Sequence, residues 1–183
     1  MEELLLKILN SINDVVWGPP MLILLVGTHI FLTFKLLGIQ RYTFKGIKLS
    51  LAKSYEGEGD VSHFGALTTA LAATVGTGNI VGVATAVGFG GPGAVFWLWI
   101  TGVFGIATKY AETLLSVKYR TKNELGQMSG GPMYVMERGM GMKWLGILFA
   151  FFTSIAGFGI GVTAQSNSIS DLMESTFNIP TWI

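Results

Sequence analysis

A short polar interruption lies inside one of the most apolar stretches of the chain. Thr69 to Ala86 reads TALAATVGTGNIVGVATA, and its centre, Val75 to Asn79, combines two glycines, a threonine and an amide. Glycine costs about 1 kcal/mol relative to alanine inside a helix, so the pattern predicts a helix that is broken near 75–79. Such a break presents unpaired carbonyl groups and a negative dipole end on one side, and unpaired N–H groups and a positive end on the other.

These two ends can hold a cation beside an anion without any charged side chain, and the segment carries none. An amino acid next to a sodium ion supplies that combination of charges. Asn79 would add a side-chain carbonyl for the cation, and Thr74 and Thr77 would add hydroxyl groups.

Other interpretations of the same residues remain open. Gly78-x-x-x-Gly82 is a small-residue pattern that lets two membrane helices approach closely, and close packing and an unwound site can coexist. TVGTGN also resembles the potassium-channel filter, in which carbonyl groups strip the ion of water, and this would make the protein a cation channel. A dinucleotide fingerprint is rejected because no acidic residue follows at the required spacing.

The composition is typical of a membrane protein. Half of the 183 residues are hydrophobic and 13% are charged, and the mean hydropathy is +0.55, whereas about 25% of an average soluble domain is charged. A net charge of +1 argues against nucleic acid as a partner, and the absence of cysteine excludes disulfides and thiol chemistry. Neither a hydrolytic arrangement of Ser, His and Asp nor a metalloenzyme cluster is visible, so we expect no enzyme and no cofactor.

Apolar runs of the right length predict a bundle of four transmembrane helices in a single domain, 1–183. We expect helices at about 15–37, 64–89 (broken near 75–79), 94–117 and 144–163. Two polar connectors separate them, 41–60 and 119–143. The first connector favours either an amphipathic interfacial helix or a solvated loop, and the second a loop with one short helix.

The basic residues predict the orientation of these helices. Apart from Lys7 and Lys109, the lysines and arginines fall in or beside the two connectors: Lys35, Arg41, Lys45, Lys48, Lys53, Lys118, Arg120, Lys122, Arg138 and Lys143. The positive-inside rule places these connectors in the cytoplasm and the N-terminus outside a plasma membrane. The second helix then crosses the bilayer instead of re-entering it, which argues against a channel filter.

Gly59 to Val87, GDVSHFGALTTALAATVGTGNIVGVATAV, closely resembles the alanine or glycine:cation symporter family, and Gly76-Thr77-Gly78-Asn79-Ile80 is the strongest part of the match. The resemblance continues through GGPGAVFWLWITGVFGIATKYAETLLSVKYR and GGPMYVMERGMG, so it covers most of the chain. It implies an all-α membrane protein of the leucine-transporter type, with two inverted repeats of five helices after one extra helix. The implied function is sodium-coupled symport of alanine or glycine by alternating access.

The resemblance also implies roles for individual residues. Thr77 and Gly78 would offer N–H groups to the substrate carboxylate, with Gly76 allowing close approach. The Thr74 carbonyl and the Asn79 side chain would lie near one sodium position, and the Ala72 and Val75 carbonyls near a second. Phe158 and Gln165 lie on the segment that matches a helix walling the substrate.

Members of that family are much longer than this chain. We therefore expect these residues to form the N-terminal portion of a carrier, embedded in a lipid bilayer and completed by a C-terminal repeat. Alternating access needs both repeats, so this portion is not expected to transport alone. A non-transporting assembly subunit with packing glycines remains the other alternative.

Overall fold

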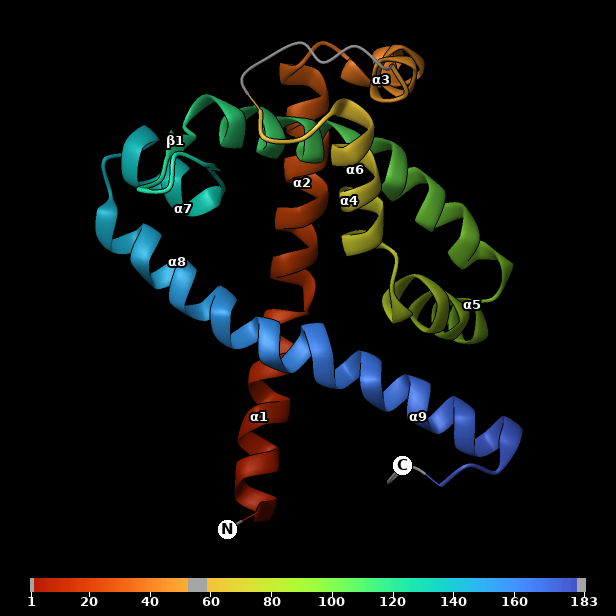
Figure 1. Ribbon diagram of the computed structural model, residues 1–183. Helices are drawn as coiled ribbons and strands as arrows, with labels where there is room; N and C mark the ends of the chain where they lie inside the picture. The colour runs from red at the N-terminus through yellow and green to blue at the C-terminus, as the bar shows by residue number, and fades with distance from the viewer. Residues whose placement is uncertain (1, 53–58, 181–183) are drawn as a thin grey trace.

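The computed structural model describes residues 2–52 and 59–180 of an almost entirely helical chain (Figure 1). Residues 53–58 of the first connector, including Lys53, and residues 181–183 lie outside the described residues. The elements of the first part are α1 (Glu2–Val16), α2 (Pro19–Lys35), the 3-10 helix η1 (Ile39–Tyr42), α3 (Thr43–Ser50) and α4 (His63–Thr74).

The second part begins after a break in the helical path. Its elements are the π-helix η2 (Gly78–Gly82), α5 (Val83–Gly90), α6 (Pro92–Lys118), the strands β1 (Thr121–Lys122) and β2 (Met128–Ser129), α7 (Pro132–Tyr134), the π-helix η3 (Val135–Gly139), α8 (Lys143–Ala156), the π-helix η4 (Gly157–Thr163) and α9 (Ala164–Phe177).

Three helical stretches among the described residues are long and apolar enough to cross a membrane, namely Glu3–Lys35, Pro92–Lys118 and Lys143–Phe177. A further pair, His63–Thr74 and Gly78–Gly90, satisfies the same criteria when taken together, with a bend of 63° between its halves. The expected all-α membrane protein is therefore confirmed at the level of fold class.

The helix bounds differ from the expected ones at both ends of the chain. Helix α1 precedes the expected first helix, and Pro19 opens α2 at a position where a missing N–H costs nothing. The last helical stretch extends through the π-helix to Phe177, well beyond 163. It ends where Asn178 adopts a left-handed conformation (φ 53°) and donates its N–H to the Glu174 carbonyl, a common helix termination.

The first connector contains helix α3, so a helix forms there, as one of the two expected alternatives had it. The second contains the short helix α7 and also an antiparallel hairpin that was not expected, in which Thr121 pairs with Ser129. The Asn123 side chain accepts the N–H groups of Leu125 and Gln127, which stabilises the turn between the strands. Gly146 on α8 lies so close to α7 that a Cβ would sit 2.7 Å from the Met133 carbonyl oxygen.

Helices α2 and α6 pack against each other through polar groups as well as apolar ones. His29 Nδ1 lies 2.6 Å from Thr108 Oγ1, and the Thr33 hydroxyl donates to the His29 carbonyl. The Gln40 amide, on η1, donates to Thr33 Oγ1 and to the Val103 carbonyl of α6. This polar cluster fixes the first long helix and η1 on α6.

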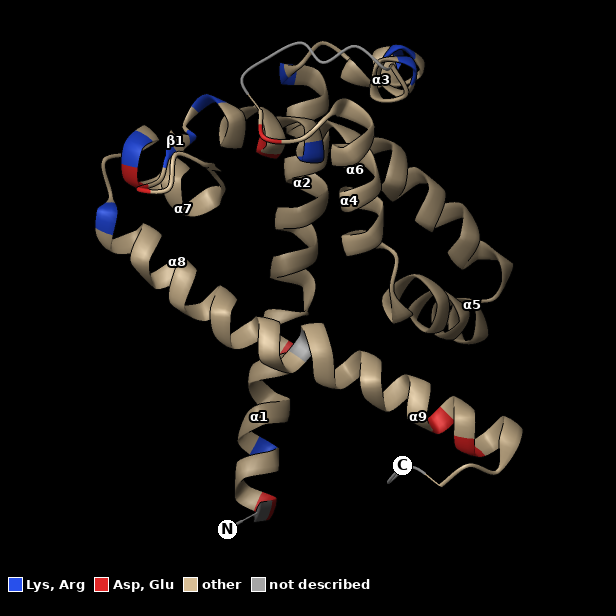
Figure 2. Cartoon of the chain, viewed as in Figure 1, with Lys and Arg blue, Asp and Glu red and all other residues tan. Residues whose placement is uncertain are grey.

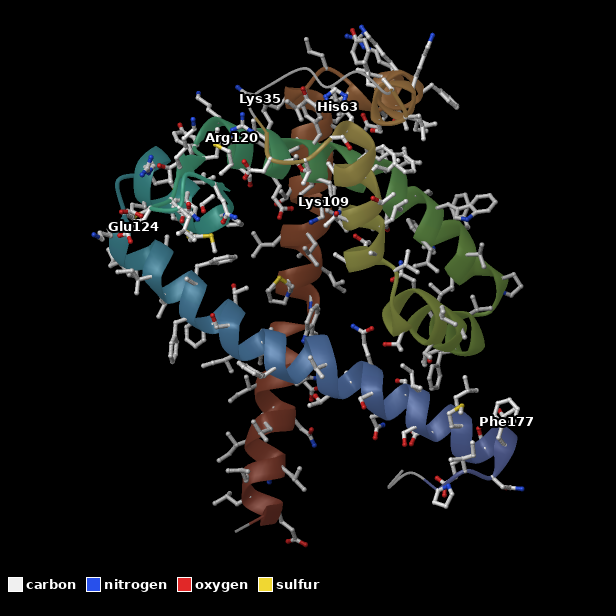
Figure 3. The ribbon with its side chains drawn as sticks, viewed as in Figure 1. Lys35, His63, Lys109, Arg120, Glu124 and Phe177 are labelled. Atoms are coloured by element: carbon white, nitrogen blue, oxygen red, sulfur yellow. The ribbon has the colours of Figure 1, made fainter. Side chains whose placement is uncertain are left out.

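Basic side chains gather at one side of the structure. Figure 2 shows lysines and arginines over α3, at the end of α2 and along the segments that lead from α6 to α8. Lys35, His63 and Arg120 lie at this same end of the molecule (Figure 3). The arrangement agrees with a polar, basic side facing away from the apolar helices.

We expect the contact between His29 and Thr108 to contribute measurably to stability. Hydrogen bonds between membrane helices contribute about 0.6 kcal/mol on average and about 1.7 kcal/mol at most. A double-mutant cycle with His29→Leu and Thr108→Val, read by unfolding of the purified protein in detergent, should give a coupling free energy in this range. Thr85→Val is the control for the loss of a threonine hydroxyl, because the Thr85 hydroxyl donates to the Val81 carbonyl one turn earlier and not to another span. A coupling free energy of zero between His29 and Thr108 would contradict the expectation.

Candidate functional site

The helical path is interrupted at Val75 and Gly76, between α4 and η2 (Figure 1). Helix α4 ends at Thr74, and Val75 adopts an extended conformation with φ −77° and ψ 112°. The next helical element begins at Gly78 and runs at 63° to α4. The chain thus changes direction at the residues where the sequence carries its glycines.

The end of α4 leaves several carbonyl groups without partners. The Val75 N–H donates to the Leu71 carbonyl, which is the last regular bond of the helix. Within the described part of the chain, the carbonyl groups of Ala72 and Val75 accept no backbone hydrogen bond, and Thr74 is the last residue of the helix. These oxygens lie at the negative end of the helix dipole, so they form a site that attracts a cation.

The other side of the break offers hydrogen-bond donors. Neither Gly76 nor Thr77 donates its N–H in any backbone hydrogen bond between residues that the structure describes, whereas the Asn79 N–H donates to the Gly76 carbonyl at 3.0 Å. Thr77 has helical angles, φ −58° and ψ −30°, so its N–H belongs to the positive end of the second half-helix. An anion is favoured at this end.

Gln165 on α9 is the predicted wall residue that the structure brings to the break. A Cβ built on Gly76 would lie 3.3 Å from Gln165 Oε1, so the amide oxygen packs against the glycine. Gln165 Nε2 donates to the Gly161 carbonyl at 2.9 Å, and Gly161 lies in the π-helix η4. Because π-helical turns are often found at functional sites, the contact between the η4–α9 stretch and the break makes this region the candidate site.

The remaining predicted residues are placed less closely. The Phe158 ring is 80% exposed, so it does not pack against the break. The Thr74 hydroxyl donates to the Ala70 carbonyl of its own helix. A Cβ built on Gly78 would meet nothing within 4 Å, and Asn79 is exposed.

Two contacts at the start of α4, the end of this helix away from the break, were not expected from the sequence. Asp60, just before α4, accepts the Met128 N–H of β2 at 2.8 Å, which ties the start of α4 to the hairpin. Ser62 caps α4 by accepting the Gly65 N–H. A serine before an apolar run is a recognisable cap signal, but no local signal points to a partner 68 positions away.

The ion pair on α6 does fit the sequence pattern. Lys109 and Glu112 lie three positions apart on one helix face, and their charged atoms are 2.9 Å apart. Both side chains are exposed in the structure. The ion pair is therefore a surface feature of α6.

Comparisons with known proteins agree on one family. The family model described as "Sodium:alanine symporter family" matches residues 1–183. An uncharacterized transporter from Haemophilus influenzae is 56% identical over 176 residues, which cover 95% of this chain and 39% of the relative. The sodium/alanine symporter AgcS of Methanococcus maripaludis is 53% identical over 180 residues, which cover 94% of this chain and 40% of AgcS.

A more distant relative is named for a different amino acid. The probable sodium/glutamine symporter GlnT of Bacillus subtilis is 37% identical over 180 residues, which cover 97% of this chain and 37% of that protein. The chain therefore spans 37–40% of the length of these three curated relatives. No solved structure matches it significantly.

The contact between Gly76 and Gln165 predicts a difference between two neighbouring glycines. Gly76→Ala places a methyl group 3.3 Å from Gln165 Oε1, and overpacking of this kind costs about 1 kcal/mol. Gly78→Ala meets nothing within 4 Å and should be neutral or stabilising by up to about 1 kcal/mol. Unfolding in detergent measures both changes.

The variant Gly76→Ala with Gln165→Ala serves as the rescue control, because removing the amide removes the obstacle. Equal stability of Gly76→Ala and Gly78→Ala would show that Gln165 does not pack on the break.

Proposed function

Because this chain belongs to the sodium:alanine symporter family, we propose that it is the N-terminal part of a carrier that couples transport of a small neutral amino acid, alanine or glycine, to sodium. The family match confirms the resemblance seen in Gly59 to Val87. Members of this family are transporters, so the protein acts by binding and conformational change, with sodium as the coupling ion and no covalent chemistry.

The observation that supports this proposal is that backbone groups on both sides of the break form no backbone hydrogen bond with other described residues. They are the carbonyl groups of Ala72 and Val75 on one side and the N–H groups of Gly76 and Thr77 on the other. A discontinuous helix with these two ends is the arrangement by which such carriers bind a substrate carboxylate and a cation. We therefore assign α4, η2 and α5 to one discontinuous membrane span.

Sodium is held by oxygen atoms on the α4 side in this proposal. The Thr74 carbonyl and the Asn79 side chain supply neutral ligands at one position, and the Ala72 and Val75 carbonyls supply them at a second. The helix dipole adds a partial negative charge. Binding the ion also satisfies carbonyl groups that would otherwise be unpaired in the bilayer.

The amino acid lies on the η2 side. Its carboxylate accepts from the N–H groups of Thr77 and Gly78, and the lack of a side chain at Gly76 allows the close approach. Gln165 forms the wall opposite. The Gln165 amide oxygen keeps acceptor capacity beside Gly76, because the hydrogen bond to Gly161 uses only the amide nitrogen. Glycines and threonines leave room for a small side chain, which favours alanine or glycine.

The membrane orientation follows from the basic side of the molecule. The lysines and arginines around α3, the hairpin and η3 face the cytoplasm, so the chain is a multi-pass plasma-membrane segment with its N-terminus outside (Figure 2). Alternating access then requires a second, inverted repeat from the same carrier, which rocks against this one within the lipid bilayer.

The cation channel and the assembly subunit are less well supported. The curated relatives with assigned roles are named as symporters and carriers. The two half-helices that meet at the break lie at 63° to each other. Binding of alanine and glycine to the full-length protein, titrated with sodium against potassium, tests the proposal. Sodium-dependent binding supports it, and conductance without alanine binding would favour a channel.

Removing the amide of Asn79 should weaken sodium binding specifically. Loss of one polar ligand to a charged group costs about 1.5 kcal/mol, so Asn79→Ala should raise the sodium concentration for half-maximal alanine binding about tenfold. Asn167→Ala is the matched control, because that amide bonds to Asp171 within α9 and should leave the sodium dependence unchanged. Unchanged sodium dependence in Asn79→Ala would remove Asn79 from the cation site.

Removing one N–H group should weaken binding of the carboxylate. Thr77 has a φ of −58° that proline can adopt, so Thr77→Pro deletes the donor with little strain. We expect alanine affinity to fall about 10- to 100-fold, as for a lost hydrogen bond to a charged group. Thr77→Ala keeps the N–H and should lose far less. Similar affinities in the two variants would contradict the half-helix assignment.

A further inference from the structure

An open groove lies between α3 and α6, away from the break. It has a volume of about 420 Å³, within the range of about 300–1,000 Å³ that is usual for ligand pockets. One face of η1 and α3 forms one wall, and two residues of α6 form the other. The lining residues are Ile39, Tyr42, Thr43, Lys45, Gly46, Leu49, Ile106 and Tyr110.

The path of the backbone explains why this space is open. Gly38 has a φ of +68°, a left-handed conformation that favours glycine and turns the chain after α2. The 3-10 helix η1 then packs on α6, fixed by the Gln40 amide on the Val103 carbonyl. Helix α3 continues past this contact. Gly46 has no side chain to fill the space beneath the helix, and no atom lies within 4 Å of the position that a Cβ would take.

The groove is apolar inside and basic at its edge. Ile39, Leu49 and Ile106 supply aliphatic surface, and Lys45 supplies a charge. Lys35, Arg41, Lys45 and Lys48 are the charged residues of 35–52, and that stretch holds no acidic residue. Figure 2 shows this basic character at α3. Arg41 lies over the Tyr42 ring, 4.9 Å from its centre.

We propose that this groove binds an anionic phospholipid of the cytoplasmic leaflet, with one acyl chain between α3 and α6 and the phosphate on Lys45. The aliphatic walls suit the acyl chain. The basic charge of Lys45, which forms no ion pair among the described residues, suits the anionic headgroup. Tyrosine is enriched where hydrocarbon meets headgroups, and Tyr42 and Tyr110 line the same groove as Lys45. The choice of leaflet rests on the orientation proposed above; the lipid site does not depend on which amino acid is carried.

The other side chains of α3 support a lipid as the occupant. Phe44 is 86% exposed, and Ile47 and Leu51 are also exposed. A helix with basic and apolar residues of this kind lies at a membrane surface with its apolar side among the acyl chains. Lipid is therefore the molecule that surrounds the open end of the groove.

Native mass spectrometry of the full-length carrier in detergent tests the site, with phosphatidylglycerol and phosphatidylcholine of the same acyl chains as probes. The wild-type protein should retain phosphatidylglycerol more tightly. Lys45→Gln should lower phosphatidylglycerol affinity about fivefold, as one basic residue near a headgroup contributes on this scale. Lys48→Gln, on the same helix but outside the groove lining, should change it by less than about twofold.

A second pair of variants tests the acyl chain. Gly46→Leu adds a side chain at a Cβ position that has no atom within 4 Å, so it should reduce retention of both lipids by filling part of the groove, while Gly46→Ala should reduce it less. Monodisperse elution of each variant establishes that it is folded, and sodium-dependent alanine binding is measured separately so that the lipid site and the transport function can fail independently.

Three outcomes would overturn the proposal. Equal losses in Lys45→Gln and Lys48→Gln would show diffuse attraction to an anionic surface. Full lipid retention in folded Gly46→Leu would show that no acyl chain enters the groove. Absence of retained phosphatidylglycerol in the wild-type carrier would show that other parts of the carrier cover the groove.

Discussion

The central constraint on this structure is the cost of unpaired backbone groups in hydrocarbon. Each buried N–H or C=O without a partner costs several kcal/mol in a bilayer, so a break at mid-membrane survives only where something else binds those groups. At the break, the Ala72 and Val75 carbonyl groups and the Gly76 N–H form no backbone hydrogen bond with other residues that the structure describes. In the proposed carrier, a cation and a carboxylate would satisfy both sets together. Binding of the two ligands would then be coupled through the backbone itself, without a charged side chain between them.

The same constraint explains where regular and irregular helices occur. Helices α2 and α6 are regular and contact each other through His29 and Thr108, which fixes their relative position. The π-helical segments η2 and η4 occur on the two stretches that meet at Gly76 and Gln165. A π-turn shifts the hydrogen-bond ladder and leaves backbone groups available for other partners. Irregular backbone is thus present on both stretches that line the proposed substrate site, while a third π-helix, η3, lies in the connector between α6 and α8.

Parts of this arrangement could be predicted from local sequence. Glycines and an asparagine inside an apolar run indicate an interruption near 75–79, because their helix propensity is poor whatever surrounds them. Clustered lysines likewise indicate the basic side of the molecule, because their positions along the chain are given by the sequence itself. The register of Gln165 on Gly76 could not be obtained, because η4 departs from the 100° periodicity on which such a prediction depends. The hairpin was missed because its strands have two residues each and are supported by Asp60, which is 68 positions from Met128.

The contacts around the break also indicate which part of the molecule can move. The start of α4 is tied to the hairpin by Asp60, and α2 is fixed on α6 by the polar cluster of His29, Thr33 and Gln40. At the break itself, the atoms nearest to the Cβ position of Gly76 belong to the Gln165 amide, the end of a flexible side chain. A hinge needs residues that tolerate changes in φ and ψ, and Gly76 lacks the Cβ that restricts those angles. In the proposed carrier, the residues beside the ligands are therefore also those at which the backbone can change the angle between the two half-helices.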